Sequence, residues 1–316
     1  MNEQFKNDVA EGLGGKPKFL SSKYFYDEIG DDLFVQIMRM PEYYLTDAEF
    51  EIFAEKNNQI MEKLGLQADI YFELIELGAG DGTKTKELLK PLVNKGYKFS
   101  YSPVDISEHA LVGLRNSLAE EIPALEVTTK QGDYFDVLNH LKKEKHPKIV
   151  LFLGSNLGNL KDDQAQLFLK KIGETLNEGD KLLLGVDMIK DARIVLPAYK
   201  DEAGITSKFN MNLLTRINRE LGGNFDTSQF YHHAYYTEEE GIAKSYIVSK
   251  QRQEVYIQKL EMTYTFDEEE KIHVEISRKY NDQILKSILT GTNLTVQDKL
   301  MDTKSYFADY ILAVTK

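Results

Sequence analysis

The chain has 316 residues, of which 42% are hydrophobic and 28% charged, and its 51 Asp and Glu outnumber its 39 Lys and Arg. This apolar content supports a large folded core and excludes a disordered or low-complexity protein. The acidic balance opposes contact with phosphate backbones, so we expect no nucleic-acid partner. The chain has no cysteine, which excludes disulfides, a cysteine nucleophile and thiolate metal sites.

The N-terminal region is polar. It lacks the apolar run of a signal peptide, and no stretch of the chain has the length of a membrane span, so we expect a cytoplasmic protein with no membrane partner. Residues 1–20, rich in Gly and Lys, are expected to form a loosely held arm. The apolar spacing over 21–65 is helical, with Leu33, Ile37 and Met40 on one face and Pro41 after them.

A regular alternation of strands and helices follows. The pattern predicts strands at 70–77, 98–107, 124–133, 148–156 and 180–189, with helices at 83–96, 107–121, 135–144 and 162–176. Such alternation is typical of a doubly wound parallel sheet. The nearly continuous apolar run at 148–156 predicts a central strand that is buried on both faces.

After residue 190 the pattern changes. We expect helices over 191–221, antiparallel strands over 228–280, and two strands in 294–316 that rejoin the sheet. The fold class is therefore α/β, a Rossmann-like domain interrupted by an α+β insertion. The predicted domains are an N-terminal arm and helices that join the insertion (1–50), a ligand-binding domain (51–190), the insertion (191–285) and the final strands (286–316).

A glycine-rich loop, ELGAGDG at 76–82, lies between a predicted strand and a predicted helix. Gly78 and Gly80 allow the backbone to turn tightly and to approach a ligand. Asp105 ends the next strand, where a carboxylate can accept both hydroxyls of a ribose. Asp133 follows the third strand, where it could accept from an adenine amino group. Together these positions predict an adenosine pocket.

The spacing G-x-G-x-G differs from the G-x-G-x-x-G of dinucleotide sites, and the acidic loop has no lysine pattern for polyphosphate. S-adenosylmethionine carries a positive sulfonium and no phosphate, so it fits this loop better than ATP or NAD. Taken alone, the glycine run is also compatible with an ordinary strand–helix turn.

Six blocks of sequence then occur in order: KYFYDEIGDDLFVQIMRMPEYYLTDAE (23–49), ELGAGDGTKT (76–85), PVDIS (103–107), FLGSNLGNL (152–160), DMIKD…AYKDEAGITSKFNMNLL (187–214) and VEISRKY (274–280). They resemble the S-adenosylmethionine-dependent histidine Nα-methyltransferases of ergothioneine biosynthesis, over nearly the whole chain from about residue 20. The resemblance implies a class I methyltransferase sheet with an inserted substrate domain. It also implies methylation of the α-amino group of an L-amino acid, with L-histidine expected and the trimethyl betaine as end product. We expect the enzyme to be a monomer.

The resemblance also implies roles for substrate-binding residues. Asn159 and Tyr199 would hold the substrate carboxylate, and Tyr26 would lie near the amine, so that Tyr26 and Asn159 are the candidate catalytic residues. Without the resemblance, Asn159 would be interpreted as a turn residue.

Three further residues would contact the substrate side chain, namely Tyr43, Glu275 and Ser277. Glu275 and Ser277 lie two apart in a predicted strand and so face the same side. A carboxylate beside a hydroxyl can receive an imidazole through a charge-assisted N–H bond. Without the resemblance, Glu275 would be placed on a solvated face.

For the cofactor, the resemblance implies a set of residues in which Lys84 lies near the methionine carboxylate: Gly78, Gly80, Lys84, Asp105, Asp133, Tyr134 and Gly154. The alternative for Lys84 is a solvated position in the first turn of a helix.

The chain departs from the family at several positions. Leu45 and Asp47 stand where the family has Pro and Arg, and Ser245 aligns with a bulky apolar residue of the histidine-selective members. A small residue there would enlarge the pocket, so a larger aromatic amino acid is an alternative substrate. A peptide N-terminus and a non-catalytic cofactor-binding module also stay open. Adjacent His232 and His233 point to opposite faces of a strand, and no metal site is predicted.

Overall fold

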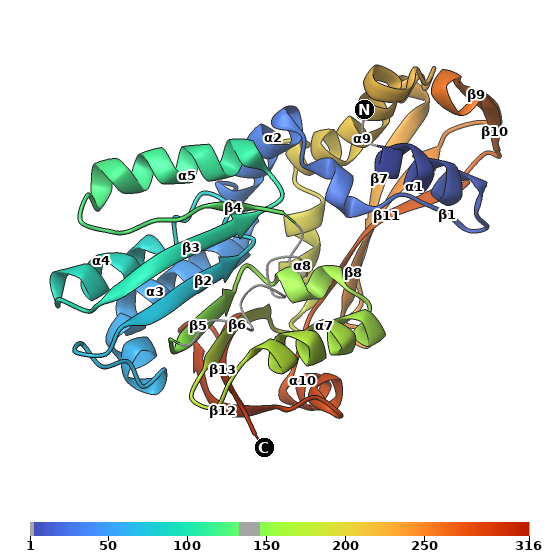
Figure 1. The fold of residues 1–316 in the computed structure, drawn as a ribbon. Coiled ribbons are helices and arrows are strands. Elements are labelled where there is room, and N and C mark those ends of the chain that lie inside the picture. Colours follow the sequence, from blue (N-terminus) through green and yellow to red (C-terminus); the bar gives the residue numbers. More distant parts are fainter. Residues whose placement is uncertain (1–2, 133–145, 316) are drawn as a thin grey trace. The chain divides into compact units, whose positions relative to one another are not determined.

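The computed structural model describes residues 3–132 and 146–315 (Figure 1). The chain forms two compact units, each built from two segments. The first unit comprises Met1–Tyr44 and Lys190–Ser277, and the second comprises Leu45–Ile189 and Arg278–Lys316. The units divide after residues 44, 189 and 277, whereas the boundaries expected from the sequence follow residues 50, 190 and 285.

The second unit contains a seven-stranded sheet in the order β12-β13-β6-β5-β2-β3-β4. Its strands are β2 (Phe72–Leu77), β3 (Phe99–Asp105), β4 (Lys130–Gln131), β5 (Lys148–Phe152), β6 (Lys181–Asp187), β12 (Leu294–Met301) and β13 (Phe307–Val314). The strands β6, β5, β2, β3 and β4 pair in parallel, and β13 is antiparallel to both β6 and β12. This confirms the Rossmann-like sheet and the return of the last two strands to it.

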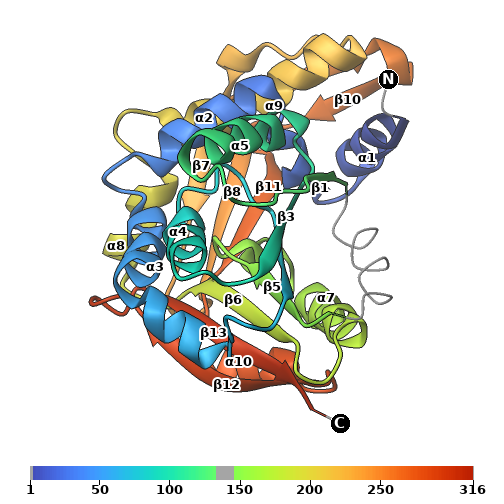
Figure 2. The same ribbon diagram turned by 60° about the vertical axis from the view of Figure 1, so that its left-hand side comes forward.

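Helices cover both faces of this sheet. Leu74 and Ile75 belong to different core clusters because successive strand residues point to opposite faces. On the face of Leu74 lie α3 (Tyr44–Lys63), α4 (Lys86–Asn94) and α5 (Glu108–Glu121). On the face of Ile75 lie α7 (Asp162–Thr175) and α10 (Asp282–Leu289), and Figure 2 shows α3 and α4 on the side of the sheet opposite α7.

The central strand is buried as predicted. Every residue of β5 is buried, including Lys148, whose ammonium pairs with Asp180 at 2.9 Å. The predicted strand at 124–133 is largely wrong, because only Lys130–Gln131 pairs with β3 as a strand and Val127 adds an isolated bridge to Tyr101. This segment is at the sheet edge, where it has a neighbour on one side only. The predicted helix at 135–144 lies outside the described residues.

The first unit combines a four-stranded sheet, a hairpin and helices. The sheet has the order β1-β11-β8-β7, from β1 (Lys18–Phe19), β11 (Lys271–Arg278), β8 (Ile242–Ser249) and β7 (Phe230–Tyr235), and the hairpin pairs β9 (Gln253–Ile257) with β10 (Met262–Phe266). The helices are α1 (Glu3–Gly14), α2 (Glu28–Met38), α8 (Ala192–Tyr199) and α9 (Ile205–Leu221). Short 3₁₀ turns lie at Ser22–Phe25 (η1), Asn156–Asn159 (η2, second unit), Thr227–Gln229 (η3) and Gln258–Leu260 (η4).

The expectation of a loose N-terminal arm is wrong. Residues Glu3–Gly14 form α1, and Phe5, Val9 and Leu13 are buried in the core of the first unit. These three residues recur every four positions and so form one narrow apolar stripe on a helix. Across the described part of the chain, no helix combines the length and the apolar character needed to cross a membrane.

Candidate active site

The glycine loop follows β2 at the carboxyl edge of the seven-stranded sheet. Gly78 has a φ of 76° and Gly80 a φ of 54°, a left-handed conformation that favours glycine. A Cβ at Gly80 would meet no atom within 4 Å, so the backbone conformation, not crowding, accounts for glycine there. The Gly80 N–H donates to Oδ2 of Asp105 at 3.1 Å, and the Ser107 N–H donates to Oδ1 at 2.9 Å. Asp105 therefore ties the glycine loop to the end of β3.

Burial raises the pKa of Asp105, although backbone N–H groups favour its charged form. A carboxylate has about four acceptor positions on its two oxygens. Asp105 can therefore bind the loop and still accept hydrogen bonds from a ligand with vicinal hydroxyls. The residues at this edge of the sheet fit the adenosine part of S-adenosylmethionine.

Glu76, just before the glycine loop, has a structural role. Its side chain is buried and accepts hydrogen bonds from Thr85 Oγ1 at 2.7 Å and from the Tyr101 hydroxyl. Burial raises the pKa of Glu76 to about 7, although both hydroxyl donors favour its charged form. Glu76 thus connects the start of α4 to β3 from inside the core.

Lys84 and Gly154, both predicted to bind the cofactor, are brought together by a third residue. The Lys84 ammonium forms an ion pair with Glu49 of α3, and the Gly154 N–H lies 3.0 Å from each Glu49 carboxylate oxygen. The Glu49 side chain is fully buried. Glu49 ends the block at 23–49, but nothing in the local sequence assigns it a role, and sequence analysis missed it.

The loop after β5 explains the GSNLGN sequence. Gly154 and Ser155 have φ values of 69° and 58°, and Ser155 Oγ accepts a hydrogen bond from the Asp187 N–H at 3.0 Å. A Cβ at Gly158 would lie 2.7 Å from the backbone oxygen of Arg278, so only glycine fits. Asn159, at the end of η2, is exposed. Two other predicted cofactor residues, Asp133 and Tyr134, lie outside the described residues.

In the first unit, an aromatic cluster surrounds Phe34 of α2. The ring of Tyr26 meets Phe34 edge-on at 5.5 Å between centroids and Phe209 at 5.8 Å, and the ring of Tyr43 meets Phe34 at 6.3 Å. The structure therefore places Tyr26 and Tyr43, two predicted substrate residues, around one phenyl ring. Such aromatic surroundings suit a cationic ligand.

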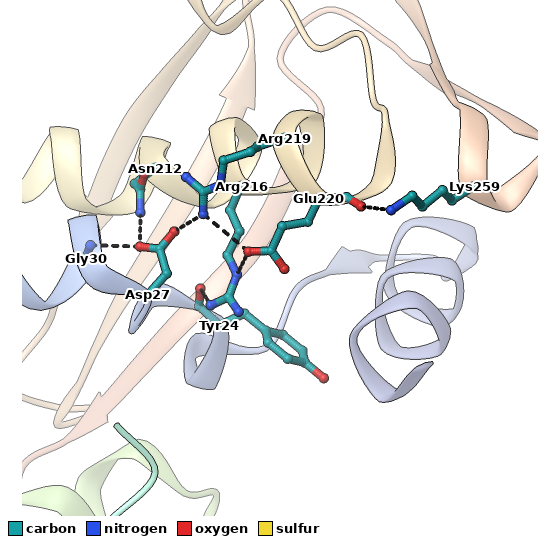
Figure 3. A network of polar contacts seen from close by, with 8 residues as sticks. All are labelled: Tyr24, Asp27, Gly30, Asn212, Arg216, Arg219, Glu220 and Lys259. Atoms are coloured by element: carbon teal, nitrogen blue, oxygen red, sulfur yellow. Dashed lines mark hydrogen bonds and ion pairs between the residues drawn. The ribbon is translucent and has the colours of Figure 1, made fainter. Parts of the chain in front are cut away.

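Asp27 fixes the segment that carries Tyr26 (Figure 3). Its Oδ1 accepts from the Gly30 N–H at the start of α2 and from Asn212 Nδ2, each at 2.8 Å, and its Oδ2 pairs with Arg219 of α9. Burial opposes the charge of Asp27, but these three donors outweigh it and lower the pKa of the carboxyl.

A second arginine of α9 adds to this network. Arg216 donates from Nη1 to the Tyr24 carbonyl at 2.9 Å and from Nε to Glu220 at 2.9 Å (Figure 3). The chain around Tyr26 is therefore held to α9 on both sides.

On β11, Glu275 is half-buried and accepts a hydrogen bond from Ser245 Oγ of β8 at 3.0 Å. Ser277 is buried on the same strand, and Tyr199, the last residue of α8, is also buried. Ser245 is fully buried, so its small size does not by itself open space to solvent. The predicted receptor for the substrate side chain thus contains the hydroxyl of Ser245 in addition to that of Ser277. The sequence alone indicates only the small size of Ser245.

The histidines do not form a metal site among residues 3–132 and 146–315, where no group of three or more His, Asp or Glu could hold an ion. Burial and, to a lesser extent, the neighbouring His233 lower the pKa of His232 to about 4, so this imidazole is neutral near pH 7.

Comparisons with known proteins show similarity along almost the whole chain. The profile of the family described as histidine-specific methyltransferase, SAM-dependent, matches residues 5–314. The histidine N-alpha-methyltransferase of Mycobacterium tuberculosis is 35% identical over 289 residues, which cover 92% of this chain and 88% of that protein. Ergothioneine biosynthesis protein 1 of Schizosaccharomyces pombe is 30% identical over 93% of this chain and 38% of its own length. An L-tryptophan methyltransferase of Psilocybe serbica is 27% identical over 95% of this chain and 90% of that enzyme.

Proposed function

The chain belongs to the histidine-specific, S-adenosylmethionine-dependent methyltransferases, and we propose that it methylates the α-amino nitrogen of L-histidine, up to the trimethyl betaine. It is an N-methyltransferase with a class I methyltransferase sheet and an inserted α+β domain. The observation that carries the proposal is the match over residues 5–314, which includes the glycine loop of the second unit and β11 of the first.

The cofactor supplies a methyl group activated by a sulfonium. Asp105 would accept the ribose hydroxyls, and Gly78 and Gly80 would let the loop backbone approach the ligand. Lys84 would meet the methionine carboxylate beside Gly154. Asp133 and Tyr134 remain predicted contacts on the resemblance alone.

The substrate would be held at both ends. Glu275, oriented by Ser245, would accept an imidazole N–H, with Ser277 and Tyr43 as further contacts of the side chain. The remaining predictions assign the substrate carboxylate to Asn159 and Tyr199. Binding at both ends fixes the nitrogen, and most of the catalytic effect of such a site is positional.

Only an uncharged amine has the lone pair that methyl transfer needs. Tyr26, near the amine, would orient that lone pair, and the proton would leave to water or through the tyrosine hydroxyl. After the first and second transfers the product ammonium must again lose a proton. The surrounding rings of Phe34 and Tyr43 would stabilise the cation that builds up on nitrogen.

Histidine and two of its analogues, each incubated with S-adenosylmethionine labelled at its methyl group, test this proposal. Histidine is expected to take up label. Nα-acetylhistidine, whose amine is blocked, and imidazole propionate, which has no amine, are expected to remain unlabelled. Label on Nα-acetylhistidine would place the reaction on a group other than the α-amine and contradict the proposal. The Glu275→Gln variant is expected to raise the KM for histidine while it leaves cofactor binding unchanged.

The second candidate substrate is a larger aromatic amino acid, favoured by Ser245 in place of a bulky residue and by the likeness to the tryptophan methyltransferase. Tryptophan in the same labelling experiment distinguishes the two. We further propose that the protein acts as a monomer in the cytoplasm, on a free amino acid and with no nucleic-acid or membrane partner.

A further inference from the structure

A buried carboxylate joins two loops at the carboxyl edge of the seven-stranded sheet. Glu49 of α3 pairs with the Lys84 ammonium and accepts the Gly154 N–H at 3.0 Å on each oxygen. Its side chain has no exposed surface, whereas that of Lys84 is 21% exposed. A charge this deeply buried is costly unless it is paired, so these two partners determine where Glu49 lies.

A second buried carboxyl lies beside Glu49. Asp309 of β13 is fully buried, and neither of its oxygens accepts a hydrogen bond from any donor in the described part of the chain. Two adjacent carboxyls share a proton more readily than they both ionise. Burial, and then the charge of Glu49, raises the pKa of Asp309 well above its ordinary value. The neutral form of Asp309 is therefore favoured beside Glu49, whose carboxylate forms the ion pair with Lys84.

The sheet makes room for this pair of carboxyls. A Cβ at Gly185 of β6 would lie 2.1 Å from Glu49 Oε1 and 2.9 Å from Asp309 Oδ1. Glycine weakens a strand interior and often marks a close approach by another group. At Gly185 the approaching groups are the two carboxyls.

We propose that Glu49 is a positioning residue for the cofactor, because it holds the Lys84 ammonium where that group receives the carboxylate of the amino-acid end of S-adenosylmethionine. The inference rests on the proposed role of Lys84. An ammonium has three N–H donors, and Glu49 accepts one of them. A lysine already held by Glu49 loses less rotamer freedom when a ligand binds than a mobile lysine would.

Two ligands that differ in the carboxylate test this inference by calorimetry. S-adenosylhomocysteine has the amino-acid end, and 5′-methylthioadenosine has the same adenosine thioether without it. Glu49→Gln and Lys84→Met are each expected to weaken S-adenosylhomocysteine binding by about tenfold or more. Binding of 5′-methylthioadenosine is expected to stay within about twofold in both variants. The double variant is expected to bind S-adenosylhomocysteine no more weakly than Lys84→Met alone, because both substitutions remove the same contact with the ligand.

Asp309→Asn is the matched control, since an amide keeps a neutral donor toward Glu49. It is expected to keep S-adenosylhomocysteine binding within about twofold of the wild type. If Glu49→Gln does not fold, Glu49→Asp retains the charge on a shorter side chain. This variant is expected to bind S-adenosylhomocysteine with an affinity between those of the wild type and Lys84→Met, and 5′-methylthioadenosine as the wild type does.

Two results would overturn the inference. Equal loss of both ligands in the Glu49 variant would show that the residue only supports the loops. If the fold-losses in S-adenosylhomocysteine affinity of the two single variants multiply in the double variant, Glu49 does not act through Lys84. If Lys84→Met binds S-adenosylhomocysteine like the wild type, the proposed role of Lys84 fails, which is a separate outcome from either of these.

Discussion

The Ser245 hydroxyl donates a hydrogen bond to Oε2 of Glu275 over 3.0 Å and so connects the neighbouring strands β8 and β11. One oxygen of the carboxylate is thereby fixed, and the other keeps a defined direction. Ser245 is thus a hydrogen-bond partner of Glu275, the residue predicted to receive the imidazole.

Ser245→Ala is expected to raise the KM for histidine by roughly tenfold, since a hydrogen bond to a charged group contributes about 1.5–3 kcal/mol. Affinity for S-adenosylhomocysteine should not change. Steady-state kinetics and calorimetry measure the two quantities. Ser249→Ala is the matched control, because Ser249 is equally buried on β8 but donates to the Gln251 carbonyl at 2.8 Å. An equal rise in KM in both variants would count against a role for the Ser245–Glu275 bond.

Asp27→Ala is expected to lower the free energy of unfolding by about 2 kcal/mol, because it removes a helix cap and leaves Asn212 and Arg219 without this partner. It should also raise the KM for histidine, since Asp27 adjoins Tyr26. Denaturant unfolding and kinetics measure both effects. Asp226 caps η3 from an exposed position, and Asp226→Ala should lower stability much less than Asp27→Ala does. Similar losses from both substitutions would show that the buried network adds nothing to the cap.

Two glycine substitutions are expected to change stability in opposite directions. Gly185→Ala would drive a methyl group into Glu49 and should destabilise the protein by about 1–3 kcal/mol. Gly113 is exposed in α5 with no atom within 4 Å of an added Cβ, and Gly113→Ala should stabilise by up to about 1 kcal/mol. Thermal unfolding gives both signs. A Gly185→Ala protein as stable as the wild type would mean that the two carboxyls do not lie against β6.

The buried Glu76 predicts a pH dependence of stability. Its pKa rises from 4.5 to about 7 on folding, so between these values the folded state binds a proton that the unfolded state has lost. The contribution of the neutral carboxyl is complete below pH 4.5 and is lost as the pH rises through 7. The stability of Glu76→Gln relative to the wild type should therefore increase by about 3 kcal/mol between pH 4.5 and pH 8. A difference between the two proteins that does not vary with pH would contradict the shift.

The sheet of the second unit was predictable because its signals are local. Long apolar runs predict the strands, the helical spacing between them predicts the helices, and the glycine loop at 76–82 marks a turn from strand to helix. The succession of elements along the chain follows directly. The α1 helix was missed because its apolar stripe is only one residue wide in a polar context, and its burial depends on partners from distant segments such as α9.

The candidate site was predictable only in part. Asp105 follows from its place at the end of β3, and Glu275 from the family resemblance. Glu49 could not be found in this way, because its partner Lys84 is 35 residues away and a glutamate in a helix is usually exposed. Its burial becomes evident only when Gly154, Gly185 and Asp309 meet around it.

Histidine Nα-methylation is tested most directly by mass spectrometry of the protein incubated with S-adenosylmethionine and an equimolar mixture of the twenty amino acids. Histidine alone is expected to gain methyl groups, up to three, all on the α-nitrogen. Methylation of another amino acid in preference to histidine would contradict the assignment of the substrate and of the Glu275 receptor.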